Sequence, residues 1–145
     1  MAVPESIAQA PGLATAGLIV VRQRRLLLAY SNNRRAWYLP GGKVDAGETP
    51  EQALHREIEE ELSLVLRPRQ LRPYGHVTAL AYGEVPARRM EQDCFLYALG
   101  EDERIRPGQE IGALRFFCAE DYAREPAQVS GVLKVMEMLR ADGLM

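Results

Sequence analysis

Residues 41–64 read GGKVDAGETPEQALHREIEEELSL, a glycine-rich turn followed by a short helix with an acidic C-terminal end. Thr49 is a favourable N-cap because its hydroxyl can accept a hydrogen bond from a backbone N–H of the first turn. Pro50 suits the first helical position, where its missing N–H has no consequence, and Gln52 falls where a capping box needs its partner. The pattern therefore predicts a helix that begins at Pro50.

Two sets of side chains on this helix predict two adjoining faces. Residues that recur every four positions predict a buried stripe of Leu54, Ile58 and Leu62. Acids at i, i+3 and i+4 share a face beside that stripe, namely Glu57, Glu60 and Glu61. Each acid opposes the negative end of the helix dipole by a few tenths to about 1 kcal/mol. A divalent cation would remove this conflict, and oxygen ligands favour Mg²⁺ or Mn²⁺ over zinc.

A solvated acidic face is the alternative, since runs such as EIEEE are commonly exposed. The preceding turn favours a ligand site, because glycine allows positive φ and a close approach of the backbone. Its glycines are Gly41, Gly42 and Gly47. Glu48 stands at the helix entrance. Arg56 lies four residues before Glu60, a spacing that lets an arginine orient that carboxylate.

With these residues in place, the stretch resembles the Nudix box, G-x5-E-x7-R-E-U-x-E-E-x-G-U, in which U is apolar. The specified positions hold Gly42, Glu48, Arg56, Glu57, Ile58, Glu60, Glu61 and Leu64. Ser63 departs from the pattern, because the family has glycine there. Positive φ is common at helix exits, and a serine in that conformation would cost about 1 kcal/mol. The segment GGKVDAGETPEQA is also similar to the box of MutT-type nucleotide-pool sanitisers.

The resemblance implies a Nudix hydrolase, which cleaves the pyrophosphate bond of a nucleoside diphosphate linked to another moiety. The catalytic set that it implies is Glu57, Glu60, Arg56 and Glu48, with the last two holding the cluster in place. It implies Mg²⁺, with Mn²⁺ as a substitute, bound by Glu57, Glu60, Glu61 and the Gly41 carbonyl. The substrate stays open among a nucleoside triphosphate, a nucleotide sugar, an ADP-ribose-like compound and a dinucleoside polyphosphate.

The base that accepts a proton from the attacking water could belong to the acidic helix or to a later acidic loop. Nudix enzymes often supply one more acid from such a loop. In this chain the candidates are Glu101, Asp102, Glu103 and Glu110.

Contacts to substrate phosphates are expected from the loop before the glycine turn. Arg34 or Arg35 could reach the phosphates, because the guanidinium fork suits them, although a surface-loop arginine is the plain alternative. Lys43 and Gly42 complete the expected substrate-binding set. Trp37 is expected to pack in the core rather than stack on a base.

Length and composition indicate one domain over residues 1–145, with a loose arm over residues 1–11. The net charge of −2 favours a small-molecule nucleotide substrate over extended nucleic acid. The absence of a long apolar run or a signal-peptide pattern predicts a cytoplasmic protein that does not enter membranes. A homodimer is possible. Cys94 and Cys118 are expected to be free thiols, and two histidines make a histidine-based zinc site improbable.

Apolar runs predict the remaining elements. Expected strands cover residues 13–21, 26–30, 74–82, 91–99 and 113–118, with another beginning at Val65 and Leu66 until Pro68 interrupts it. The first two should form a hairpin, and His76 should be packed in its strand. A second helix is expected over residues 128–139. This order indicates an α+β fold, and the resemblance implies a Nudix-type α/β/α sandwich with a central mixed β-sheet flanked by helices.

Two other functions compete with the hydrolase. A non-catalytic nucleotide sensor of the same fold would bind without cutting, and such a protein would be expected to carry a broken acid set. A scaffold could use the acidic helix face to bind a basic partner, but this leaves the glycine turn unexplained. Hydrolysis of a nucleotide panel with Mg²⁺ separates the three.

Overall fold

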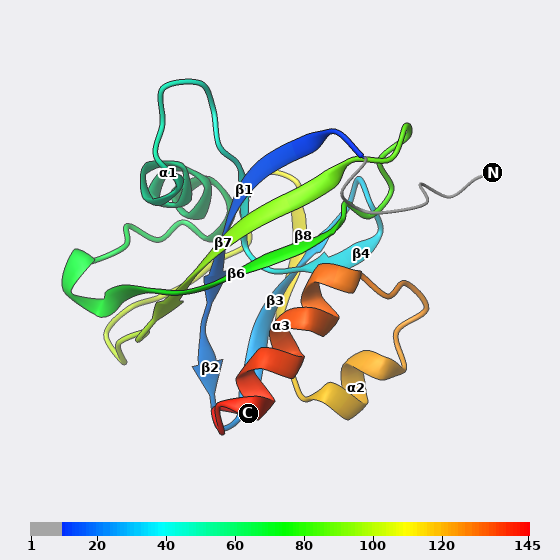
Figure 1. Ribbon diagram of the computed structural model, residues 1–145. Coiled ribbons are helices and arrows are strands. Elements are labelled where there is room, and N and C mark those ends of the chain that lie inside the picture. The colour runs from blue at the N-terminus through cyan, green and yellow to red at the C-terminus, as the bar shows by residue number, and fades with distance from the viewer. Residues whose placement is uncertain (1–9) are drawn as a thin grey trace.

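The computed structural model describes residues 10–145, in which five strands precede the first α-helix and three more strands precede the last two (Figure 1). The strands are β1 (Gly12–Ile19), β2 (Val21–Arg22), β3 (Arg25–Ser31), β4 (Ala36–Tyr38), β5 (Gly41–Lys43), β6 (Leu71–Leu80), β7 (Arg89–Tyr97) and β8 (Ile111–Phe117). The helices are α1 (Pro50–Leu62), α2 (Ala119–Ala123) and α3 (Ser130–Ala141), with a 3₁₀ turn, η2, at Pro68–Gln70.

The strands form two four-stranded sheets. One has the order β5-β1-β7-β6 and is mixed, because β1 runs parallel to β7 while the other pairs are antiparallel. In the other, β3 pairs antiparallel with β2, β4 and β8. The chain crosses between them at Val20, whose carbonyl accepts a hydrogen bond from the Leu27 N–H at 2.9 Å.

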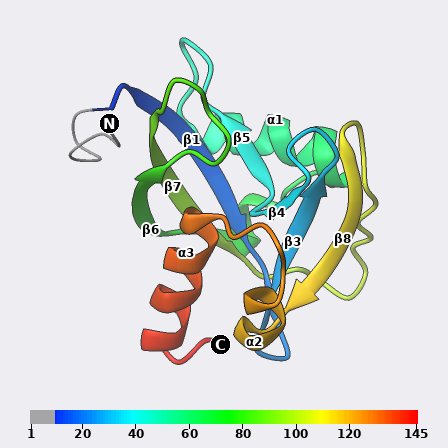
Figure 2. The same cartoon turned by 90° about the vertical axis from the view of Figure 1, so that its right-hand side faces the viewer.

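Helices cover both sides of these strands, α1 on one side and α2 and α3 on the other (Figures 1 and 2). Side chains alternate along β1, so that Leu18 faces α1 while Ile19 faces α3. The predicted stripe of α1 is fully buried, and it consists of Leu54, Ile58 and Leu62. The α/β/α sandwich with a mixed sheet is therefore confirmed.

Both ends of α1 follow from the local sequence. The helix begins at Pro50, and Thr49 and Gln52 form the reciprocal capping box that was predicted. Its C-cap is Ser63, with φ 54° and ψ 37°, and the Ser63 N–H donates to the Glu59 carbonyl at 3.2 Å. The serine that replaces the family glycine thus adopts the left-handed conformation that glycine would adopt without strain.

Several local expectations were wrong. The glycine turn is partly a strand, because Gly41–Lys43 pairs with β1. The predicted hairpin is confined to β2 and β3, because β1 joins the other sheet. No strand forms at residues 65–66; Val65 is 68% exposed, and η2 begins at Pro68. The short helix α2 had no clear signal.

His76 and the N-terminal arm also differ from what the sequence predicts. His76 is exposed rather than packed, and its imidazole lies 2.7 Å from Glu91 and 2.8 Å from Asp93. Of the arm expected over residues 1–11, residues 1–9 lie outside the described part. The Pro11 carbonyl accepts a hydrogen bond from the Arg89 N–H at 2.7 Å, so this end of the arm is held. Within residues 10–145, no helix is both long and apolar enough to cross a membrane.

Candidate active site

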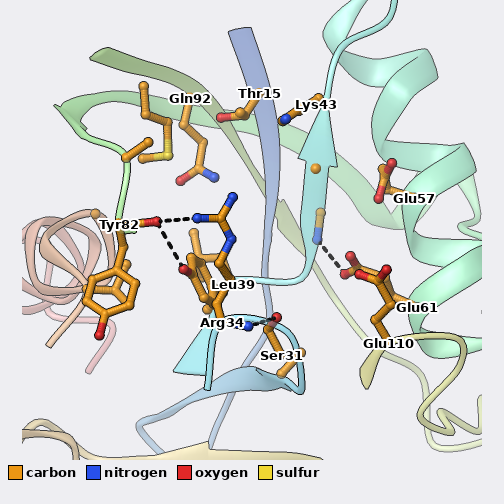
Figure 3. Close-up of a pocket in the computed structure, with 18 of the residues that line it drawn as sticks. Thr15, Ser31, Arg34, Leu39, Lys43, Glu57, Glu61, Tyr82, Gln92 and Glu110 are labelled. Atoms are coloured by element: carbon orange, nitrogen blue, oxygen red, sulfur yellow. Dashed lines mark hydrogen bonds between the residues drawn. The ribbon is translucent and has the colours of Figure 1, made fainter. Parts of the chain in front are cut away.

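A cavity of about 560 Å³ lies where the mixed sheet, α1 and the start of α3 meet (Figure 3). One wall is acidic, formed by Glu57, Glu60 and Glu61 of α1 together with Glu110 from the loop before β8. The far end contains the apolar and aromatic side chains of Leu13, Leu39, Tyr82 and Met90, with the paired charges of Arg34 and Glu84 beside Tyr82. The cavity therefore offers a charged end and a hydrophobic end to one ligand.

Glu61 has the strongest electrostatic conflict on the acidic wall. The pKa of its carboxyl is raised to about 8, chiefly by burial and also by the neighbouring charges of Glu57, Glu60 and Glu110. The Gly41 N–H opposes this shift by donating to Glu61 Oε1 at 3.0 Å. A positive ligand at this wall would restore the ionised form.

Arg56 holds part of the acidic wall from behind. Its Nε and Nη2 donate to the two oxygens of Glu48 at 2.8 Å each, and its Nη1 donates to Glu57 Oε2 at 2.7 Å. The bond from Arg56, joined by the Asp45 N–H, lowers the pKa of Glu48 to about 2. Arg56 also forms the expected ion pair with Glu60, with Nη1 3.9 Å from Oε1, but its hydrogen bonds to acids go to Glu48 and Glu57.

Two glycines of the turn lie so close to neighbouring atoms that a Cβ at either position would collide with them. A Cβ on Gly42 would lie 2.5 Å from the Glu57 carboxyl carbon, so this position leaves room for the acid. Gly41 has φ +136°, and a Cβ there would overlap the Ala16 carbonyl oxygen of β1. The Arg56 Nη2 also donates to the Lys43 carbonyl at 3.0 Å, which ties α1 to this strand.

Among the later-loop acids, the structure brings only Glu110 to the cavity. The loop is attached to the end of α1, because the Arg106 N–H donates to the Leu62 carbonyl at 2.9 Å and the Gly108 N–H to the Glu61 carbonyl at 2.8 Å. Glu101, Asp102 and Glu103 do not line the cavity.

The acids that lie away from the cavity have other contacts. Asp102 pairs with Arg67 at 2.9 Å on the surface. Glu103 is buried and accepts hydrogen bonds from the Tyr97 hydroxyl at 2.6 Å and from Gln70 Nε2 at 2.7 Å. Burial would raise the pKa of Glu103, but these bonds and the Gly100 N–H outweigh it and hold the pKa below its usual value.

The expected phosphate contacts separate in the structure. Arg34 and Lys43 line the cavity, whereas Arg35 is exposed, has φ 53° and lies outside it. The Arg34 guanidinium pairs with Glu84 and donates to the Tyr82 carbonyl at 3.1 Å.

Trp37 packs against the core, whereas two polar strand residues line the cavity. Trp37 packs edge-to-face against Phe117 with ring centroids 5.0 Å apart, as expected. Sequence reasoning missed Thr15 and Gln92, which line the cavity. Thr15 is the one polar residue of an otherwise apolar strand, whereas Gln92 stands between Glu91 and Asp93 and gave no signal.

A bound Mg²⁺ or Mn²⁺ fits the donor set of this wall. The carboxylates are oxygen donors, and Glu61 is already shifted by burial and by its neighbours in the direction that a cation would reverse. Across residues 10–145, no three acidic, histidine or cysteine side chains are drawn together as a completed ion site. The acids line one wall of the cavity, and their side chains would have to move closer together to coordinate an ion.

The family of this chain is shown by comparison with known proteins. Residues 11–137 match the NUDIX domain, so the chain belongs to that family. It is similar to the crystal structure of a MutT NUDIX hydrolase from Burkholderia pseudomallei, with a TM-score of 0.68 and 25% identity. That alignment covers 86% of this chain and 95% of the other.

Two curated relatives share shorter stretches. The 8-oxo-dGTP diphosphatase of Haemophilus influenzae is 81% identical over 26 residues, which are 18% of this chain and 19% of that protein. An RNA pyrophosphohydrolase of Shewanella woodyi is 30% identical over 92 residues, 63% of this chain and 52% of that protein. The alignments thus span from a fifth to about half of these relatives.

Proposed function

We propose that the protein is a Mg²⁺-dependent hydrolase that cleaves the pyrophosphate bond of a nucleoside diphosphate linked to another moiety. The observation that carries the proposal is the Glu61 carboxyl, which is held among three other acids at a cavity wall with its pKa raised to about 8. The complete set of acids in the Nudix box, with Gly42 at its first position, supports it. So do the names of the two relatives, which describe pyrophosphate hydrolysis on nucleotides.

Each residue of the acidic wall has a role in this proposal. The ion would be held by Glu57, Glu60, Glu61 and the Gly41 carbonyl. When bound there, Mg²⁺ would neutralise phosphate oxygens and polarise the attacking water. Glu110 faces the same space and would accept the proton of that water. Arg56 and Glu48 would keep Glu57 in position.

The substrate phosphates would be held by two cations that line the cavity, Lys43 beside the acidic wall and Arg34 beside Tyr82. Lys43 lines the cavity from β5. Arg34 is paired with Glu84, so a phosphate would have to compete with that carboxylate for the guanidinium. The neighbouring apolar end would take the part of the substrate that is not phosphate.

Hydrolysis of a substrate panel with Mg²⁺ tests the proposal. The panel contains 8-oxo-dGTP, dGTP, ADP-ribose, a nucleotide sugar, a dinucleoside polyphosphate and 5′-triphosphorylated RNA, with products separated by chromatography. Glu60→Gln should lower the rate about 100-fold or more, because it removes charge from the wall. Glu59→Gln is the matched control, since Glu59 is exposed on the same helix and lies outside the cavity.

The outcomes are distinct. Chelation should abolish hydrolysis and added Mg²⁺ should restore it. Equal rates for the two variants would contradict the role of the acidic wall. Mg²⁺ and nucleotide binding without turnover of any compound would favour the sensor.

A further inference from the structure

Three polar side chains form a row across the mixed sheet. In the strand register, Thr15 of β1 lies opposite Lys43 of β5 on one side and Gln92 of β7 on the other. Residues directly opposite one another project from the same face, and two strand spacings span about 10 Å. All three line the cavity (Figure 3). The row therefore leads from the strand beside the acidic wall into the apolar end.

Within residues 10–145, Thr15 is the member of the row whose hydroxyl has no hydrogen-bond partner. The residue is 7% exposed, and its Oγ1 is the one buried side-chain nitrogen or oxygen without a hydrogen-bond partner among residues 10–145. A buried hydroxyl left unpaired typically destabilises a fold by about 1–3 kcal/mol. Since the hydroxyl lies at a cavity wall, a ligand can supply the missing partner.

Gln92 has an amide that the protein leaves largely unused. The residue is 8% exposed, and within the described chain its carboxamide receives one hydrogen bond, from the Cys94 thiol at 3.9 Å, which is a weak donor. The amide rests over Gly17, where a Cβ would lie 2.9 Å from its carboxamide carbon. Gly17 thus makes room for a side chain that offers a donor and an acceptor side by side.

We propose that Thr15 and Gln92 recognise the nucleobase of the substrate. The base would present a hydrogen-bond donor next to an acceptor on the edge that meets the Gln92 amide, with the Thr15 hydroxyl as a third contact. Leu39 and Met90 supply the apolar surface on which a flat ring can lie. Lys43, at the other end of the row, would meet the first phosphate. This assignment rests on the proposed function, because it takes the ligand to be a nucleotide.

Kinetics on substrates with and without a base test the assignment. Gln92→Leu and Thr15→Val should raise KM for the preferred nucleotide about three- to tenfold each, with kcat nearly unchanged. Neither should alter KM for inorganic tripolyphosphate, which has no base. Thr78→Val is the matched control, because the Thr78 hydroxyl donates to Glu91 at 2.8 Å and lies outside the cavity.

Stability separates recognition from a structural role. Thr15→Val removes an unpaired buried hydroxyl, so its melting temperature should equal or exceed that of the wild type although KM rises. Thr78→Val breaks a hydrogen bond and should lower the melting temperature without changing KM. A Thr15→Val protein that melts earlier and shows wild-type KM would overturn the assignment.

Binding without turnover keeps this test independent of catalysis. Calorimetry would compare adenosine and guanosine 5′-monophosphates with ribose 5-phosphate and with purine riboside 5′-monophosphate, which lacks the exocyclic group. The better of the two nucleotides should bind more tightly than the other two compounds, and this advantage should shrink in both variants. Equal losses for ribose 5-phosphate, or no loss for any compound, would overturn the assignment. Absence of all hydrolysis with the binding pattern intact would instead refute only the proposed function.

Discussion

Replacing Gly42 with alanine should damage catalysis while leaving the fold largely intact. The new Cβ would lie 2.5 Å from the Glu57 carboxyl carbon, so that carbon must retreat by about 0.9 Å to reach an ordinary contact of 3.4 Å. Misplacing a functional group by about 1 Å can lower a rate about 100-fold. The shift also strains the 2.7 Å bond from Arg56 to Glu57, and losing it would lower the free energy of unfolding by about 1.5–3 kcal/mol.

The neighbouring glycine provides the matched comparison. A Cβ on Gly41 would overlap the backbone carbonyl of Ala16 rather than a movable side chain, and its φ of +136° adds about 1–3 kcal/mol of strain. Gly41→Ala should therefore lose folded protein first. Gly47→Ala is a second control, because no heavy atom lies within 4 Å of its added Cβ and the substitution adds only the backbone strain of its φ of +84°.

The assay measures kcat at saturating substrate and Mg²⁺ beside thermal unfolding for all three variants. We expect a large fall in kcat with a modest change in melting temperature for Gly42→Ala, and a large fall in melting temperature for Gly41→Ala. A Gly42→Ala protein with wild-type kcat would refute the argument, as would one that unfolds as readily as Gly41→Ala.

Glu103→Gln should lower the free energy of unfolding by about 1–3 kcal/mol with kcat retained, whereas Glu110→Gln should lower kcat with little effect on unfolding; the opposite result would exchange their roles. Ser63→Gly should gain about 1 kcal/mol, or roughly 2–4 °C in melting temperature, whereas Ser130→Gly, at the first residue of α3, should lose stability in the same calorimetric scans because it removes the hydroxyl that donates to the Leu80 carbonyl at 3.5 Å. The His76 pKa is raised by hydrogen bonds to two carboxylates, so its contribution to stability is complete below about pH 6.5 and is lost as pH rises through the folded pKa. Because the site is exposed, the stability difference between wild type and His76→Gln should be under about 1 kcal/mol and should shrink between pH 6 and 8; a difference that grows with pH would contradict the sign.

Local signals allowed the helix and its functional face to be predicted. Thr49, Pro50 and Gln52 determine where α1 begins, because caps act within one turn. The spacing of the α1 acids places them on one face without reference to any other element. Local reasoning failed where partners come from elsewhere. The residues after Pro40 form β5 because β1 lies beside them, and both oxygens of Glu48, outside the helix, accept hydrogen bonds from Arg56.

The remaining site residues depend on tertiary placement. Four acids of the later loop were equivalent in sequence, and the choice of Glu110 depends on how that loop attaches to α1. Arg34 and Arg35 were equally good candidates until the left-handed conformation of Arg35 separated them. Thr15 and Gln92 become partners only through the parallel register of two strands 77 residues apart. No periodicity within a single strand could have paired them.

The C-terminal end of α1 explains why the acidic wall points to a positive ligand. Its carbonyls are capped by neutral N–H groups, from Ser63 to Glu59 and from Gly108 to Glu61, and the last turn contains no basic residue. A Cβ on Gly108 would overlap the Glu60 carbonyl, so this close attachment depends on glycine. The loop that caps the helix also brings Glu110, a further negative charge, to the same cavity. Selection for stability alone would favour lysine or arginine at this helix end. The protein instead satisfies the backbone and leaves the carboxylates in excess of Arg56, the arginine that pairs with them, and this excess is the charge that the proposed Mg²⁺ would balance.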